Sequence, residues 1–212
     1  MARGRENEPL MPEPFAYFLT WSTYGTWLPG DERGWIEFRR GWQLPDGVRK
    51  LEAEARMSED ACRLDGEQRA VVERQVAETC KARGWELHAV NCRSNHAHVV
   101  VSAVQAPKVV RNQLKAWCTR RLKELEVRRR LAEEPLRARV GLISEVTAST
   151  LTRSVSEESA PHASTPRRSV SEGCVREDWW AERGSQRFIN DSESLEAAIL
   201  YVRDGQDKRR EH

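Results

Sequence analysis

Residues 85–103 read Trp-Glu-Leu-His-Ala-Val-Asn-Cys-Arg-Ser-Asn-His-Ala-His-Val-Val-Val-Ser-Ala. Two apolar segments rich in β-branched residues, 85–92 and 96–103, lie on either side of the polar turn Arg93-Ser94-Asn95. Such a pattern is typical of an antiparallel hairpin. We therefore expect two neighbouring strands of a central sheet in this part of the chain.

Helical patterns flank this hairpin on both sides. From Asp65 onward, apolar residues recur every three or four positions as far as Gly84, a residue type that commonly ends a helix. After the hairpin, Pro107 suits the first turn of a helix whose apolar stripe runs to Leu125. Residues 106–140 contain eleven Lys and Arg against four Glu, so the second helix is expected to carry a basic outer face.

The remaining elements are expected nearer the ends of the chain. Residues 15–23 are aromatic and β-branched and predict a first buried strand, whereas the Gly- and Pro-rich residues 24–47 predict an irregular loop. Residues 179–189 predict a last strand with an irregularity at Gly184-Ser185. Asn190-Asp191-Ser192 then supplies the N-cap of a final short helix that ends near Gly205.

One domain is expected over residues 15–206, because 212 residues are too few for two ordinary cores. Residues 1–14 are expected to be a flexible N-terminus and residues 207–212 a tail. Residues 144–176 contain Ser, Thr, Pro and charged residues with few large apolar groups, and they repeat the sequence Arg-Ser-Val-Ser-Glu. We expect a disordered insertion there, because so little apolar area cannot offset the entropy cost of ordering.

Composition gives few direct clues to function. Thirty-five Lys and Arg against 33 Asp and Glu leave a net charge of +2, so the total charge does not indicate a nucleic-acid partner. Five cysteines with no CxxC pair are typical of reduced thiols in a cytoplasmic protein. We expect neither an export signal nor a membrane segment, because no long apolar run is present.

The candidate chemistry lies on the second strand of the predicted hairpin. His96 and His98 are two residues apart, so they project from the same face of the sheet and are placed to share one cation. Two histidines at this spacing also occur as ordinary polar residues on a half-exposed strand. The spacing alone leaves both interpretations open.

The residues around this pair resemble a known family. Asn95-His96-Ala97-His98 followed by valines resembles the HUH motif of the single-tyrosine transposases of the insertion-sequence-200 type and of their relatives associated with repetitive extragenic palindromes. Phe18-Leu-Thr-Trp-Ser-Thr-Tyr-Gly-Thr-Trp-Leu-Pro-Gly30 is similar to the opening strand and loop of that family, and Ala197-Ala-Ile-Leu-Tyr-Val-Arg203 to its late helix.

The resemblance implies a fold and a reaction. The fold is an α+β ferredoxin-like sandwich with an antiparallel sheet and helices on one face, compatible with the order of elements expected above. The reaction is the nicking and rejoining of single-stranded, hairpin-containing DNA through a 5′-phosphotyrosine. Tyr201 is implied as the nucleophile, with His96 and His98 as ligands of Mg²⁺ or Mn²⁺. Relatives act as monomers or as homodimers, and both states stay open.

The sequence departs from the family at the third metal ligand. An amide side chain is expected four residues after the tyrosine, but that position is Gly205. Gln206 is the nearest amide, and Asp204 shares the face of Tyr201 and also suits a hard cation. We expect Gln206 rather than Asp204, because an aspartate is equally common as a solvated charge.

DNA contacts are expected from two groups of residues. A basic helix face can follow phosphates, and tryptophans in a glycine-rich loop, Trp42 among them, can stack on unpaired bases. The alternatives are an ordinary solvated helix face and tryptophans that pin a long loop. The candidate DNA-binding residues are Lys108, Arg111, Lys115, Arg120, Arg121, Trp27 and Trp35.

Three other functions compete with a transposase. A replication-initiator or relaxase-like nickase would share the histidines and the tyrosine but act at a fixed origin. A catalytically silent DNA-hairpin binder derived from a transposase would tolerate the missing amide at position 205. A mononuclear metal hydrolase would use His96, His98 and a third residue such as His88, with no need of a tyrosine.

Overall fold

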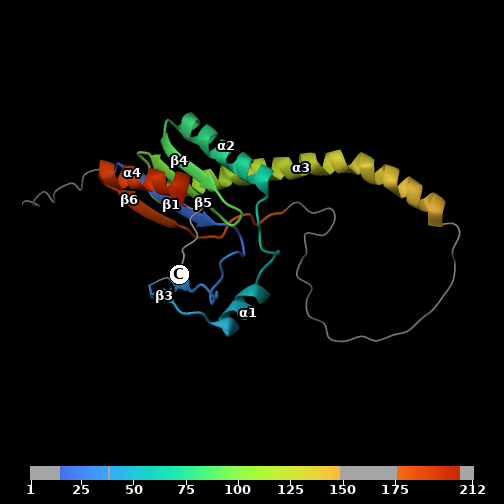
Figure 1. Ribbon diagram of the computed structural model, residues 1–212, viewed down its shortest axis with the longest axis horizontal. Helices are drawn as coiled ribbons and strands as arrows, with labels where there is room; N and C mark the ends of the chain where they lie inside the picture. Colours follow the sequence, from blue (N-terminus) through green and yellow to red (C-terminus); the bar gives the residue numbers. More distant parts are fainter. Residues whose placement is uncertain (1–14, 38, 149–175, 206–212) are drawn as a thin grey trace, which may run out of the picture.

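The computed structural model describes residues 15–37, 39–148 and 176–205 (Figure 1). The strands are β1 (Ala16–Ser22), β2 (Trp35–Glu37), β3 (Gly41–Gln43), β4 (Glu86–Cys92), β5 (His96–Ser102) and β6 (Ser185–Ile189). The helices are α1 (Gly47–Ala55), α2 (Gly66–Arg83), α3 (Pro107–Ala148), α4 (Ser192–Leu200) and the π-helix η1 (Tyr201–Gly205). The expected flexible N-terminus at 1–14 and tail at 207–212 lie outside the described residues.

Four strands form one antiparallel sheet in the order β4-β5-β1-β6. Along the chain, the elements β1, α2, β4, β5, α3 and β6 follow the βαββαβ order of a ferredoxin-like sandwich. The expected α+β fold is therefore confirmed. The expected first strand and hairpin are also confirmed, each within one residue at either end.

Helices cover both faces of this sheet. Helices α2 and α3 pack on one face around the main core, which contains Leu19, Val99 and Leu114. Helix α4 and η1 pack on the other face around a second core that includes Val100 and Val202. The expectation of helices on one face therefore holds for α2 and α3 and is wrong for α4. The physical reason lies in β5, whose residues 97–101 are all buried and so require cover on both sides.

The ends of the helices follow the expected signals. Asp65 and Gln68 form a capping box at the start of α2, and Gly84 adopts a left-handed conformation (φ 68°) at its end. Asp191 caps α4 by accepting a hydrogen bond from the Ser194 backbone N–H at 2.7 Å. These caps fix where α2 and α4 begin.

Helix α3 is longer than expected and extends beyond the sheet (Figure 1). It runs to Ala148, so the first five residues of the segment expected to be disordered are helical, and residues 149–175 lie outside the described part of the chain. Good helix formers, mainly Arg, Leu and Glu, fill residues 120–134 and favour a helix over this stretch. Arg129 anchors this part of α3 to α2, because its Nη1 lies 2.6 Å from an Asp65 carboxylate oxygen.

Regular structure also occurs where an irregular loop was expected. Strands β2 and β3 pair, and α1 follows them after the N-cap Asp46. The left-handed conformations of Arg39 (φ 70°) and Gly41 (φ 75°) allow the tight hairpin between the two strands. We call residues 27–37 and 39–56 the small module, which Figure 1 shows set apart from the main sheet.

Strand β6 is shorter than the expected strand over 179–189. Only Ser185–Ile189 pairs with β1, and Trp180 makes an isolated bridge to Thr23. Side chains of α3 donate hydrogen bonds to backbone carbonyls between Trp180 and β6. Lys115 Nζ donates to Ala181 O at 2.7 Å, and Arg111 Nη1 donates to Gly184 O at 2.7 Å. Those carbonyls are engaged by α3, which explains the late start of the strand.

Four of the five cysteines lie in the described residues, and all four are free and buried. Cys174 lies outside them. Burial raises the pKa of the Cys62 and Cys80 thiols to about 11. Across residues 15–37, 39–148 and 176–205, no helix is both long and apolar enough to cross a membrane.

Candidate functional site

The two histidines of the motif lie side by side on β5. Their ring centroids are 4.7 Å apart, and both project from the face of the sheet that α4 covers. His98 is only 8% exposed, whereas His96 is half-buried nearer the open end of the strand. The expected placement on one face is what the strand geometry dictates.

Each ring is oriented through its Nδ1 atom. Thr20, directly across from His98 on β1, places its Oγ1 2.7 Å from His98 Nδ1. Asn95 places its Oδ1 2.7 Å from His96 Nδ1. When the proton of each ring is on Nδ1 and is donated to these oxygens, Nε2 is unprotonated and its lone pair is available to a metal. Metal-binding histidines are commonly held in this way by a polar partner on the second nitrogen.

Tyr201 lies against this pair, although it is about a hundred residues further along the chain. It begins η1 at the end of α4, and its ring centroid is 5.8 Å from that of His98. Phe18 of β1 completes the cluster, because its ring stacks on His98 at 5.3 Å and meets Tyr201 edge-on at 6.0 Å. Phe18 thus sets the spacing between the imidazole and the phenol.

A hydrogen bond from the sheet holds the tyrosine helix in place. Asn91, the β4 residue paired with His98, donates from Nδ2 to the backbone carbonyl of Val202 at 3.1 Å. The side chain of Val202 is fully buried in the second core. Both interactions act on the residue next to Tyr201 and so restrict where the phenol can move.

The other two tyrosines make contacts away from the histidine pair. Tyr17 is 6% exposed and belongs to the main core on the opposite face of the sheet. The hydroxyl of Tyr24 accepts a hydrogen bond from the Ser58 backbone N–H at 2.9 Å. Tyr201, by contrast, is 47% exposed. It is the tyrosine that combines exposure with contact to the histidine pair.

The surroundings favour neutral imidazoles. Burial, helped by His96 and by the charge of Arg93, lowers the pKa of His98 to about 4. Burial, then Arg93 and Arg33, lowers the pKa of His96 as well. Both rings are therefore neutral near pH 7, which is the form that binds metal. The two arginines also make this end of the sheet a favourable place for an anion.

The described residues hold two donors for a metal rather than three. No three His, Cys, Asp or Glu side chains in the described ranges converge on one point. Asp204 therefore does not complete a site with the two histidines here, and Gln206 lies outside the described residues. His88 is paired with Ser102 at the other end of β5, with 2.7 Å between Nε2 and Oγ, so the structure does not bring it to His96.

The basic residues of α3 lie on the face of the sheet opposite the histidines. Arg111 is 7% exposed, and burial lowers the pKa of Lys115 to about 8. Arg121 donates from Nε to Gln75 Oε1 at 2.7 Å, and Arg120 pairs with Glu124 at 3.4 Å. Lys108 is exposed. These positions favour a structural role for Arg111, Lys115 and Arg121, and they do not extend the histidine cluster.

The two tryptophan candidates differ in exposure. Trp35 is 7% exposed, and the Arg49 guanidinium lies 5.0 Å from its ring centroid. Trp27 is 43% exposed, with its Nε1 donating to Gly34 O at 2.9 Å. Trp42, across the hairpin from Ile36, is 59% exposed. Trp27 and Trp42 therefore present indole surface to solvent, whereas Trp35 does not.

Sequence reasoning missed the residues that support this site. Thr20, Asn91 and Phe18 gained their roles through strand pairing with β5 and through the packing of α4, neither of which a local pattern reveals. The only available signal was a polar residue inside each apolar strand. Asn95 belonged to the quoted motif but had no assigned role.

Comparison with known proteins adds no identification: no family model, curated protein or solved structure matches this chain.

Proposed function

We propose that this chain is a metal-dependent DNA nickase and strand transferase of the single-tyrosine transposase kind. Its substrate is single-stranded DNA that contains a hairpin. The observation that carries the proposal is the contact between Tyr201 and His98, whose ring centroids are 5.8 Å apart. An exposed tyrosine beside two neutral histidines places a possible nucleophile next to two possible metal ligands.

The proposed step exchanges one phosphodiester for another. The phenolic oxygen of Tyr201 attacks phosphorus, a Tyr–O–P bond forms, and the bond from phosphorus to the 3′ oxygen breaks. The phenolic proton passes to water, and the leaving 3′ oxygen takes up a proton. A free tyrosine has a pKa of about 10, so the site must stabilise the phenolate and the charged phosphate. The reverse reaction with a new 3′-hydroxyl joins strands.

His96 and His98 fit a divalent metal through their Nε2 atoms, because their Nδ1 atoms are held by Asn95 and Thr20. When bound, Mg²⁺ or Mn²⁺ supplies polarisation of the phosphate oxygens and orientation of the scissile bond. The chain's own contribution is the fixed ring orientation and the uncharged state of both imidazoles.

The π-helix after Tyr201 supports the assignment of Gln206 as third ligand. A π-turn closes hydrogen bonds five residues apart rather than four, so it holds about one more residue than an α-turn. Because η1 spans Tyr201–Gly205, one π-turn counted along the sequence from the tyrosine ends at position 206 rather than 205. The role of Gln206, which lies outside the described residues, remains a prediction.

Tyr201 contacts His98 of its own chain, which is the arrangement that cleavage in cis requires. A homodimer that exchanges its tyrosine helices would have to break the hydrogen bond from Asn91 to Val202 and remake it between chains. We therefore propose that the tyrosine acts in cis, which both a monomer and a homodimer without exchanged helices allow.

A second candidate has a specific observation in its favour. A silent DNA-hairpin binder derived from such an enzyme needs no complete metal site, and the described residues supply only two donors. It would bind hairpin DNA and form no covalent link.

The test is a covalent-adduct assay on the full chain. Wild-type protein is incubated with labelled single-stranded hairpin DNAs and Mg²⁺ or Mn²⁺, then denatured and separated. We expect an adduct from wild type and none from Tyr201→Phe or His98→Ala. Tyr24→Phe is the matched control, because it removes the hydroxyl of a half-buried tyrosine that is engaged by Ser58. Tight DNA binding without any adduct would favour the silent binder.

A further inference from the structure

The exposed face of the small module carries an apolar surface that nothing in the described chain covers. On the β2–β3 hairpin, Ile36 and Trp42 pair across the strands and are 65% and 59% exposed. Leu44, the residue just after the end of β3, is 79% exposed. Trp35 and Gln43 form the adjacent pair and face the other way, where Trp35 is buried.

Two indole rings each contact Gly34. A Cβ atom at this position would lie 2.2 Å from Cζ2 of Trp42, so the ring rests directly against the glycine. Trp27 donates from Nε1 to the Gly34 carbonyl at 2.9 Å. Gly34 has a φ of 79°, a conformation that a larger side chain rarely adopts. The backbone thus holds both rings in fixed positions while leaving much of their surface exposed.

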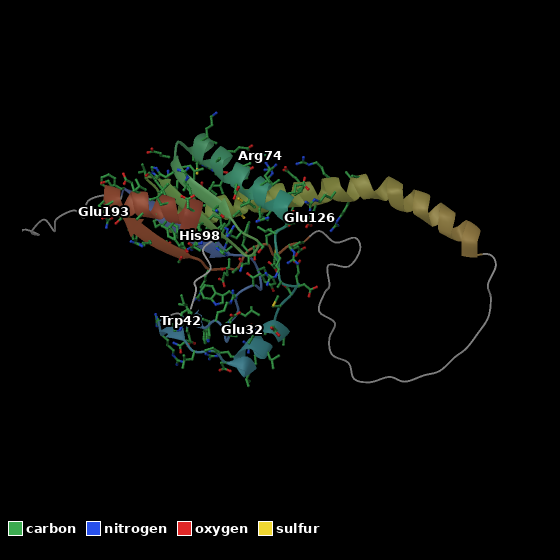
Figure 2. All side chains as sticks on the ribbon, in the orientation of Figure 1. Glu32, Trp42, Arg74, His98, Glu126 and Glu193 are labelled. Atoms are coloured by element: carbon green, nitrogen blue, oxygen red, sulfur yellow. The ribbon has the colours of Figure 1, made fainter. Side chains whose placement is uncertain are left out.

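A chain of hydrogen bonds joins Arg33, the residue before Gly34, to the histidine pair. Arg33 donates from Nη2 to the Thr26 carbonyl at 2.9 Å, and Thr26 Oγ1 donates to the Asn95 carbonyl at 3.2 Å. Asn95 in turn holds His96. Figure 2 shows Trp42 on the module and His98 on the sheet above it. The module is therefore attached to the loop that positions the candidate metal ligands.

Arg33 is fixed as a cation at this junction. Asp31 accepts from its Nε at 2.7 Å and from its Nη2 at 3.0 Å, which leaves Nη1 without a hydrogen bond to any described residue. The side chain is 56% exposed. Because this guanidinium is already held in one orientation, contact with a phosphate costs little further side-chain entropy.

We propose that the small module is a platform for single-stranded DNA, on which Trp42 and Trp27 stack unpaired bases and Arg33 Nη1 contacts a backbone phosphate. The platform rests on the proposed function, because it takes the same substrate and lies beside the same site. Exposed rigid indoles next to a positioned arginine suit a single strand, since every base has a face that can stack. A second copy of this chain is the competing occupant, and the test includes it.

The experiment measures the affinity of the full chain for a labelled single-stranded oligonucleotide by fluorescence anisotropy in EDTA, so that neither metal nor cleavage contributes. Trp42→Leu keeps apolar area but removes the stacking face, and we expect affinity to fall roughly 5- to 150-fold, with Trp42→Phe close to wild type. The matched control is Trp117→Leu, which removes a 38% exposed tryptophan of α3 on the other side of the sheet.

Arg33 is tested by the salt dependence of the same binding. Loss of one phosphate contact lowers the slope of log affinity against log salt by about 0.7 for a single strand, and we expect that change for Arg33→Gln. Arg128→Gln, at an exposed position of α3, is the control and should leave the slope unchanged.

The outcomes separate this proposal from the proposed function. If wild type forms a covalent adduct and Trp42→Leu binds DNA as tightly as wild type, the platform is overturned and the proposed function stands. Trp42-dependent binding without any adduct supports the platform and counts against nicking. If wild type sediments as a dimer, Trp42→Leu is a monomer and the two proteins bind DNA equally well, the apolar surface is a contact between two copies of this chain and the platform is overturned.

Discussion

Asn91 on β4 donates a hydrogen bond from Nδ2 to the backbone carbonyl of Val202, at 3.1 Å, and so ties the tyrosine helix to the strand beside His98. Replacement by leucine leaves a buried carbonyl without its partner, so we expect Asn91→Leu to lower the free energy of unfolding by about 1–3 kcal/mol. Misplacement of the phenol should slow adduct formation on the order of 100-fold. Urea unfolding and single-turnover kinetics measure the two effects.

Gln186→Leu serves as control for this variant, because Gln186 is exposed on the edge strand β6. It should change neither quantity appreciably. Adduct formation by Asn91→Leu at the wild-type rate would show that this hydrogen bond does not position Tyr201.

Thr20 should tune metal affinity without touching the metal. Its hydroxyl lies 2.7 Å from His98 Nδ1, and loss of such a partner typically weakens metal binding about 10- to 100-fold. We expect that loss for Thr20→Val in calorimetric titrations with Mn²⁺. Thr119→Val is the control, since it removes a hydroxyl that accepts from Trp180 Nε1 at 3.0 Å on the far face of the sheet. Equal affinities for wild type and Thr20→Val would contradict the role given to Thr20.

Because His98 is buried, we expect the folded protein to lose stability in mild acid. The pKa of His98 falls from an ordinary 6.5 to about 4 in the folded protein, so between these pH values the unfolded chain binds the extra proton. The neutral ring therefore makes its whole contribution to the free energy of unfolding above pH 6.5, and this contribution is lost as the pH falls towards 4. The effect amounts to at most about 3 kcal/mol.

Denaturant unfolding of wild type and His98→Gln at several pH values between 7 and 4 measures this effect. The variant should lose less stability on acidification than wild type does. Parallel curves for the two proteins would mean that His98 is not protonated preferentially in the unfolded state.

Arg111 should act on stability rather than on DNA affinity. It is 7% exposed and donates from Nη1 to the Gly184 carbonyl at 2.7 Å, just before β6 begins. We expect Arg111→Met to lower the free energy of unfolding by about 1–3 kcal/mol, since the carbonyl loses a charged donor. The salt dependence of DNA binding should be unchanged, and a slope reduced by about 0.7 would instead identify Arg111 as a phosphate contact.

The parts of the fold that were predictable depend on nearby residues. The β4–β5 hairpin, β1, and the ends of α2 follow from apolar periodicity and from caps such as Asp65 and Gly84. The β2–β3 hairpin was missed, because Gly and Pro are as dense in a tight hairpin as in an irregular loop. The late start of β6 depends on side chains of α3 about seventy residues away, which no local pattern reveals.

The candidate site divides in the same way. The shared face of His96 and His98 follows from strand geometry alone. Their partners do not, because Thr20 is 78 residues from His98 and meets it only through the register of β1 on β5. The assignment of Tyr201 came from resemblance, and its contact with His98 is a property of the folded chain.

Peptide mapping of the covalent adduct tests the central proposal most directly. Hairpin DNA labelled at its 3′ end is incubated with protein and metal, the adduct is digested with trypsin, and the labelled peptide is identified by mass spectrometry. We predict that the label stays with peptide 188–203, which contains Tyr201 and neither of the other tyrosines. DNA labelled only at its 5′ end should be released with a free 3′-hydroxyl. Label on a peptide carrying Tyr17 or Tyr24, or retention of the 5′ label instead, would contradict the proposed nucleophile or the polarity of the reaction.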